Sequence, residues 1–124
     1  MTTNNPANWF EIYVNDMKRA KKFYSAMLKI KFTKLNAKFP EMWGFPSNMK
    51  KYGTSGSLVC MPGVKAGGNS TVIYFRCDDC AVEAKRAKKA GGKIHKEKFS
   101  IGEYGFISLV FDTEGNLFGL QSMK

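Results

Sequence analysis

The sequence predicts an α+β fold of two paired β-α-β-β-β modules, which form a curved mixed sheet around a cleft with the helices on its outer face. Two observations predict it. The same order of alternating and helical apolar patterns occurs twice. The strand-to-helix junctions, at Val14 and Cys77, are also separated by about half of the 124 residues. We expect one domain over residues 1–124, with module one at about 7–62 and module two at about 69–124.

The first half begins with an alternating segment, WFEIYV at Trp9–Val14, which predicts a strand. Asn15 or Asp16 can cap a helix after it. Apolar side chains then recur at helical spacing, which predicts a helix with one buried face. This face is expected to contain Ala20, Phe23, Tyr24, Met27 and Leu28. Three strands are predicted to follow, at Ile30–Leu35, Met42–Phe45 and Ser55–Met61.

The second half repeats this order, beginning with the alternating segment TVIYFRC at Thr71–Cys77. Asp78 or Asp79 can cap the second helix. Gly91–Gly92 ends this helix, because glycine readily adopts the left-handed backbone of a helix C-terminus. The buried face of the helix is expected to be small, with Cys80, Ala84 and Ala87. Three strands follow, at Lys93–Lys98, Gly105–Asp112 and Asn116–Ser122, and Thr113–Gly115 joins the last two as a hairpin turn.

The chain is strongly basic, with 20 Lys and Arg against 10 Asp and Glu. The pentapeptide KRAKK occurs at Lys18–Lys22 and at Lys85–Lys89, on the two predicted helices. We favour solvated helix faces for both copies over a nucleic-acid or anionic-surface role, because no helix-turn-helix or zinc-finger spacing is present. The sequence shows no membrane span and no secretory signal. With three cysteines, an odd number, these features predict a cytoplasmic protein.

Several segments resemble the vicinal oxygen chelate superfamily of glyoxalases, bleomycin-resistance proteins and dioxygenases, most closely its single-domain glyoxalase-related branch. They are Trp9–Tyr24, Glu41–Pro46, Tyr52–Val59, Gly67–Asp79, Ala90–Ile94 and Asp112–Ser122. The resemblance implies the duplicated fold and a homodimer, with the cleft within one chain or across two. It also implies that the loops YGTSGS and GGNST border the cleft, and that Lys29 and Thr113 stand where relatives often carry glycine and proline.

Metal-dependent members of this superfamily place a divalent metal in the cleft, with ligands from the first and last strands of each half. The corresponding first-strand positions are Trp9 and Val72, and the last strand offers Gly119. The fourth ligand would come from the last strand of the first half, within Tyr52–Met61, and this segment contains no His, Asp or Glu. The side chains of Trp9, Val72 and Gly119 are not usual ligands of Zn²⁺, Fe²⁺ or Mn²⁺. We therefore expect neither a metal site of the family type nor another cofactor.

Glu11 is the candidate catalytic residue. Strand alternation places it on the cleft face, opposite Phe10, Ile12 and Val14. A carboxylate in a partly apolar cleft should have a raised pKa unless it is paired, which suits a general acid or base. The alternatives are an ion pair with Arg76 or an anchor for a loop. The residues expected to bind substrate on this face are Trp9, Tyr13, Val72, Tyr74, Arg76, Leu117, Gly119 and Gln121. Gly119 is expected to leave room for a ligand, although the same side chains could fill a closed core or a dimer interface.

Two further features carry weaker signals. Cys77 and Cys80 form a C-x-x-C pair at the second helix, but both fall on core-facing positions, so buried thiols are favoured over a redox site. His95, the single histidine, is expected to be exposed among lysines.

The function expected from these observations is binding of a small organic molecule in the cleft, without the family metal, and with a possible lyase or isomerase step. The alternative is a non-catalytic protein that sequesters its ligand, as bleomycin-resistance proteins do. A basic nucleic-acid-associated protein is the least favoured interpretation. The sequence leaves open whether the protein is an enzyme.

Overall fold

The computed structural model describes residues 5–35, 40–48 and 50–124. Its first half contains β1 (Phe10–Tyr13), α1 (Met17–Leu28), β2 (Thr33–Lys34), β3 (Glu41–Gly44) and β4 (Gly56–Cys60). Its second half contains β5 (Tyr74–Arg76), α2 (Cys80–Lys89), β6 (Lys93–Ser100), a 3₁₀ turn at Gly102–Tyr104, β7 (Phe106–Phe111) and β8 (Leu117–Ser122). Every predicted element is therefore present, although most strands are shorter than predicted.

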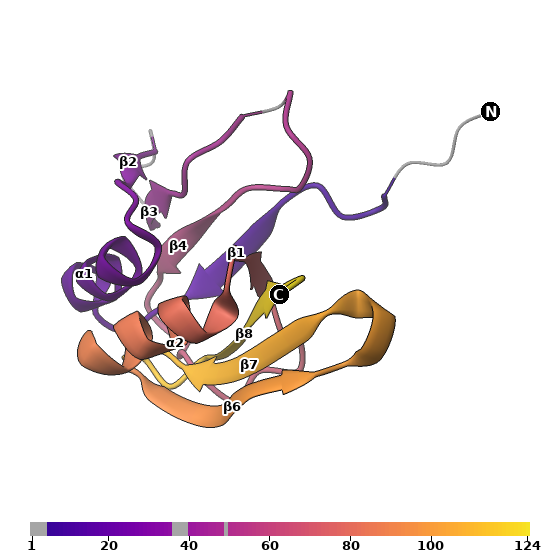
Figure 1. Ribbon diagram of the computed structural model, residues 1–124. Coiled ribbons are helices and arrows are strands. Elements are labelled where there is room, and N and C mark those ends of the chain that lie inside the picture. Colours follow the sequence, from indigo (N-terminus) through magenta and orange to yellow (C-terminus); the bar gives the residue numbers. More distant parts are fainter. Residues whose placement is uncertain (1–4, 36–39, 49) are drawn as a thin grey trace.

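The two halves form two open four-stranded sheets with the same internal order (Figure 1). The strand order is β1-β4-β3-β2 in the first sheet and β5-β8-β7-β6 in the second. In each sheet the first strand pairs in parallel with the last, and the remaining pairs are antiparallel. The predicted α+β fold of two β-α-β-β-β modules is confirmed. It differs from the prediction in having two mixed sheets where one was expected.

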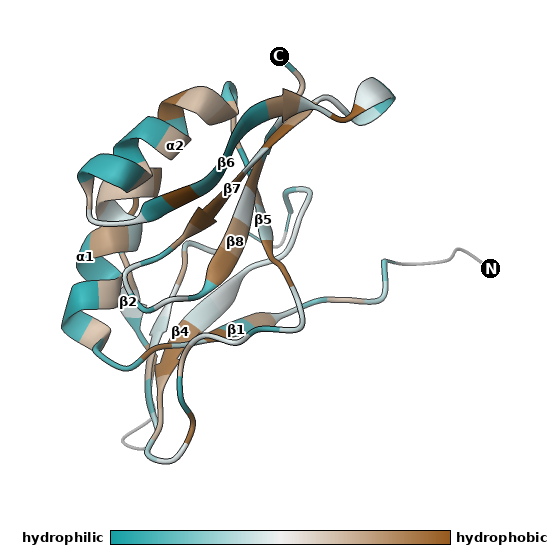
Figure 2. Cartoon of the chain, turned by 90° about the horizontal axis from the view of Figure 1, so that it is seen from below, coloured by the Kyte–Doolittle hydropathy of each residue, from teal (hydrophilic) through white to brown (hydrophobic). Residues whose placement is uncertain are grey.

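Both helices lie on one side of the molecule and pack against each other and against the sheets (Figures 1 and 2). The core is shared by the two modules, because side chains from α1 contact aromatic rings of the second sheet. Tyr24 is completely buried and its ring contacts those of Phe45, Phe75 and Phe118. The predicted buried faces are confirmed except for Leu28, which is partly exposed.

The helix caps explain where each helix begins. The carboxylate of Asp16 accepts a hydrogen bond from the backbone N–H of Arg19 at 3.0 Å. In the second module, Asp79 accepts one from Ala81 at 3.1 Å. The two KRAKK copies have one alanine each facing the core, Ala20 and Ala87, both fully buried. Most of their lysines are exposed, as expected for a solvated helix face.

The end of α1 carries a backbone conformation that is unfavourable for its residue. Lys29 caps the helix with φ 55° and ψ 52°, in the left-handed region that favours glycine. We expect Lys29→Gly to increase the free energy of unfolding by about 0.5 to 1 kcal/mol, because the steric cost of the side chain is removed. Urea denaturation measures this change.

A matched substitution at Lys31 is the control, since Lys31 is exposed and does not have a positive φ. There glycine only adds freedom to the unfolded chain, so Lys31→Gly should lower stability by about 0.5 kcal/mol. Equal destabilisation by both substitutions would contradict the left-handed cap.

Candidate functional site

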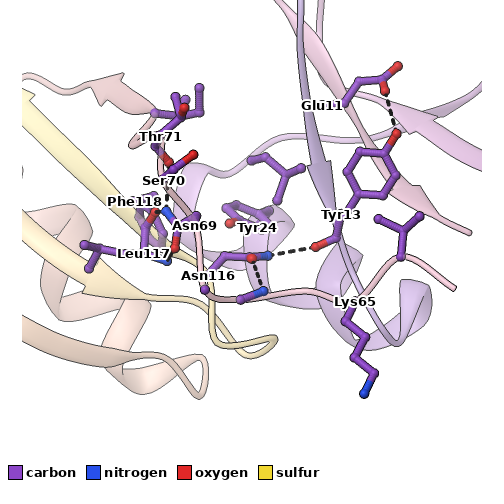
Figure 3. Close-up of a pocket in the computed structure, with 15 residues that line it drawn as sticks. Glu11, Tyr13, Tyr24, Lys65, Asn69, Ser70, Thr71, Asn116, Leu117 and Phe118 are labelled. Atoms are coloured by element: carbon purple, nitrogen blue, oxygen red, sulfur yellow. Dashed lines mark hydrogen bonds between the residues drawn. The ribbon is translucent and has the colours of Figure 1, made fainter.

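A pocket of about 350 Å³ lies at the junction of the two modules (Figure 3). Its walls come from β1, from the segment that links the modules, and from the beginning of β8. Tyr24 and Phe118, which are buried in the core, also line it. This volume is in the range of small-molecule sites. The lining residues are Glu11, Ile12, Tyr13, Tyr24, Val64, Lys65, Gly67, Gly68, Asn69, Ser70, Thr71, Ile73, Asn116, Leu117 and Phe118.

Asn116 fixes the position of two walls relative to each other. Its amide nitrogen donates to the backbone oxygen of Tyr13 at 2.9 Å, and its amide oxygen accepts from the backbone N–H of Gly67 at 2.6 Å (Figure 3). One side chain at the β7–β8 turn thereby ties β1 to the linking segment. Asn69 makes a similar tie, because its amide bonds both backbone groups of Leu117, at 2.8 Å and 3.2 Å.

The same β7–β8 turn holds the beginning of α1 through Glu114. The carboxylate of Glu114 is fully buried and accepts hydrogen bonds from the backbone N–H groups of Asn15 and Asp16, both at 2.9 Å. Arg19 donates to it from two nitrogens, at 2.6 Å and 3.0 Å. Burial disfavours the charged form, but the hydrogen bonds from Arg19, Asp16 and Asn15 outweigh burial and lower the pKa of Glu114.

A second buried contact links the turn to the floor of the pocket. The hydroxyl of Tyr24 donates to the carboxylate of Asp112 at 2.6 Å. Burial is the main cause that raises the pKa of Asp112, and its hydrogen bonds with Tyr24, Asn116 and Glu114 oppose this rise. Burial also raises the pKa of Tyr24 well above its ordinary value of 10.0, with the charge of Asp112 adding to the effect. Tyr24 therefore stays protonated and acts as a donor.

Glu11 lies on the rim of the pocket and is exposed. Its carboxylate accepts a hydrogen bond from the hydroxyl of Tyr13 at 3.1 Å, and burial together with Glu11 raises the pKa of Tyr13. The three ion pairs among the described residues do not include Glu11. Arg76, the alternative partner predicted for it, instead lies over the ring of Tyr52, 4.9 Å from its centroid.

Three of the predicted site residues line this pocket, namely Glu11, Tyr13 and Leu117. The others lie outside it: Trp9, Val72, Tyr74, Arg76, Gly119 and Gln121. Gly119 does not leave the room that was predicted, because the ring of its strand neighbour Tyr74 covers the place of a side chain. Gln121 donates to the backbone oxygen of Tyr104 at 2.9 Å.

Sequence reasoning missed most polar residues of the pocket: Lys65, Asn69, Ser70, Thr71 and Asn116. All five lie outside the strands, in the segment that links the modules or in the β7–β8 turn, where alternation gives no information on side-chain direction. The resemblance supplied one signal, since it implied that the GGNST loop borders the cleft.

The cysteines and the histidine behave as expected from their positions. Cys77 and Cys80 are buried, and burial raises the pKa of the Cys77 thiol to about 12, so it is not a nucleophile at neutral pH. His95 is exposed on β6, with its ring 5.4 Å from that of Phe111.

The side chains that the resemblance assigns to the family's metal positions lack the usual ligand atoms of a metal ion. Trp9, Val72 and Gly119 offer no oxygen or nitrogen ligand from their side chains, apart from the indole N–H, which does not coordinate metals. In addition, no three His, Cys, Asp or Glu side chains within the described ranges are close enough to hold a metal. We therefore derive no chemical step through a metal ion.

The chain shares its fold with several solved structures. A glyoxalase-related enzyme from Fulvimarina pelagi has a TM-score of 0.74 at 15% identity, covering 96% of this chain and 88% of the other. The antibiotic-binding protein TnmS3 from Streptomyces sp. CB03234 has a TM-score of 0.70 at 20% identity, with 98% of both chains covered. Glyoxalase I from Zea mays has a TM-score of 0.74 at 21% identity, but the match covers only 45% of that chain.

At these identities the structural similarity establishes the fold alone. No curated protein matches the sequence. Within the described residues, no helix is long and apolar enough to cross a membrane. The family model that describes the Glyoxalase/Bleomycin resistance protein/Dioxygenase superfamily matches residues 7–120, which is nearly the whole chain. On this evidence, and in agreement with the resemblance in its sequence, the chain belongs to that superfamily.

Proposed function

We propose that this protein binds a small organic molecule in the pocket between its modules, without a metal ion. The observation that carries the proposal is the pocket itself, whose lining combines apolar and aromatic side chains with several polar ones. The side chains at the family's metal positions support a metal-independent mode, because they cannot coordinate an ion. Recognition would then depend on shape, aromatic contacts and a few hydrogen bonds.

For an enzymatic role, we propose Glu11 as the general base of a lyase or isomerase step. Its carboxylate would take a proton from a carbon next to a carbonyl group, and the electron pair of the broken C–H bond would move to the carbonyl oxygen. Returning the proton to the resulting enolate completes the step. Glu11 lines the pocket and has one hydrogen-bond partner among the described residues, Tyr13, which supports this role.

The alternative is a protein that sequesters its ligand without a reaction. The similarity to the antibiotic-binding protein TnmS3, which extends over almost the whole of both chains, favours this candidate. It needs the same pocket but no acid or base. We also propose, from the family resemblance, a homodimer in the cytoplasm. Sedimentation at several protein concentrations would test the dimer.

Hydrogen exchange of the neutral ketone 2-tetralone in D₂O distinguishes the two functions. If Glu11 is a base, the wild-type protein should accelerate deuterium incorporation next to the carbonyl, and Glu11→Gln should reduce the rate by about 10² or more. The affinity for the ketone, measured by NMR line broadening, should differ less than twofold between the wild type and Glu11→Gln. Equal exchange by both proteins, with binding retained, would support the sequestering function.

Glu41→Gln is the matched control. Glu41 is an exposed strand glutamate whose carboxylate accepts from Trp43, two residues further on, as Glu11 does from Tyr13. Because Glu41 lies outside the pocket, its substitution should leave exchange unchanged. A separate substitution, Leu117→Trp, should abolish binding by filling the pocket. Binding that survives Leu117→Trp would overturn the proposed site.

A further inference from the structure

One wall of the pocket, the mostly exposed segment Gly67–Thr71, presents hydrogen-bond donors that have no acceptor among the described residues. The segment Gly67–Thr71 bends through two successive positive φ angles, 85° at Gly67 and 60° at Gly68. Within the described residues, the backbone N–H groups of Gly68, Ser70 and Thr71 have no acceptor. The side-chain hydroxyl groups of Ser70 and Thr71 form no hydrogen bond there either. Free backbone N–H groups at and after such a bend give a local positive potential that favours anions.

The donors are held in place by the rest of the fold. Asn69 uses its whole amide to fix the loop, with bonds to Leu117 and to the backbone oxygen of Thr71 at 2.8 Å. Gly67 is fixed from the other side by Asn116. The neighbouring N–H groups and hydroxyls therefore do not have to be ordered by the ligand, which lowers the entropic cost of binding.

The charges around the pocket also favour an anion. Lys65 lines the pocket and forms no ion pair among the described residues. Its ammonium group is exposed and directed away from Ser70 and Thr71, so it acts on an anion through the potential around the pocket and not through contact with the loop (Figure 3). Glu11 is the only acid of the lining, and it extends away from Lys65 and already accepts from Tyr13 (Figure 3). The whole chain carries a formal net charge of +10, which attracts anions from solution.

Most of the remaining side chains of the pocket lining are aliphatic or aromatic. Leu117 lies on the same side as the donor loop, while Tyr13 stands on the opposite wall (Figure 3). Ile73 and Phe118 also line the pocket. Aromatic rings and aliphatic side chains of this kind favour a flat apolar ligand body that can stack on a ring, with its polar group directed toward the loop.

We infer that the pocket binds small carboxylates with a flat apolar body, the carboxylate lying against the N–H groups and hydroxyls of Gly68–Thr71. This inference rests on the proposed small-molecule function and adds the charge and shape of the ligand. It is independent of whether Glu11 catalyses a reaction.

Three probes of similar shape and different charge test it: 2-naphthoate, the neutral 2-naphthalenemethanol and the cationic 2-naphthylmethylammonium. We expect the wild-type protein to bind naphthoate about tenfold more tightly than the neutral probe, and the cation most weakly, in fluorescence titrations at low salt. The double substitution Ser70→Ala and Thr71→Val should weaken naphthoate binding about tenfold. The same double substitution should change binding of the neutral probe less than twofold, which a general loss of structure would not do.

Lys65→Gln should weaken naphthoate binding about threefold, whereas Lys34→Gln, on the distant strand β2, is the charge-matched control and should have no effect. Binding of all three probes with equal affinity, or a preference for the cation, would overturn the inference and leave the proposed function intact. Failure of every probe to bind would count against the proposed pocket function itself.

Discussion

Glu114→Ala is expected to lower the free energy of unfolding by about 3 kcal/mol, since it leaves several donors without an acceptor. The buried carboxylate accepts from the backbone N–H groups of Asn15 and Asp16 and from Arg19. Alanine offers none of these bonds and also separates the β7–β8 turn from the beginning of α1. For a domain of this size, the melting temperature should fall by roughly 10 °C.

The pH dependence of stability gives a sharper test through Glu114→Gln, which keeps one acceptor and should cost about 2 kcal/mol at neutral pH. The pKa of Glu114 is lowered from its ordinary value of 4.5, so its charge stabilises the fold above that pH. This stabilisation is lost as the pH falls through the pKa of the folded state. The difference in the free energy of unfolding between the wild type and Glu114→Gln should therefore become smaller below pH 4.5.

Glu103→Ala is the control for this series, because Glu103 is exposed on the 3₁₀ turn and has no ion-pair partner among the described residues. Its effect should stay below about 0.5 kcal/mol at every pH. A Glu114→Ala protein as stable as the Glu103→Ala protein would show that the turn does not hold α1.

Tyr24→Phe should lower the free energy of unfolding by about 2 kcal/mol at neutral pH, as expected for a hydrogen bond to a buried charged group. The substitution keeps the aromatic contacts of the ring but removes the donor that lies 2.6 Å from Asp112. The carboxylate then remains buried with fewer donors. Thermal and urea unfolding at pH 7 would measure the loss.

The loss of stability caused by Tyr24→Phe should be smaller at acidic pH. Burial raises the pKa of Asp112 above its ordinary value of 3.8, and removal of the Tyr24 hydroxyl raises this pKa further. A raised pKa means that folding favours the protonated form, so stability is present in acid and declines as the pH rises through the folded-state pKa. The difference in the free energy of unfolding between the wild type and Tyr24→Phe should therefore be smaller at pH 3.5 than at pH 7, by about 1 kcal/mol.

Tyr13→Phe provides the matched control, because its hydroxyl also donates to a carboxylate, that of Glu11, but on an exposed rim. It should cost less than about 0.5 kcal/mol, with no dependence on pH of the kind expected for Tyr24. Equal losses for the two tyrosines would contradict the role assigned to burial.

The fold could be predicted from the sequence because each element carries a local signal. Alternation marked β1, β5 and β8, and the aspartates before the helices marked their beginnings. The separation of the sheet into two could not be predicted, because it depends on how the edge strands of the modules meet. Only the resemblance gave a signal for the left-handed conformation of Lys29, because relatives often carry glycine at this position.

The candidate site was predicted only in part. Alternation separated Glu11 and Tyr13, which are exposed or half-buried and line the pocket, from the buried Val14, because a strand has a fixed period of two. It could not show that the ring of Tyr74 covers Gly119, since this depends on the register between β5 and β8. Nor could it place Asn69 or Asn116, whose directions are set by loop hydrogen bonds across long sequence distances.

The attachment of the β7–β8 turn to α1 has a consequence for folding kinetics. The bonds from Asn15, Asp16 and Arg19 to Glu114 join residues separated by 99, 98 and 95 positions. Contacts of such high sequence separation slow folding, because a long loop must close before they form. During synthesis, the first module emerges from the ribosome well before the turn that completes it, so the beginning of α1 cannot form these bonds until Glu114 has also emerged.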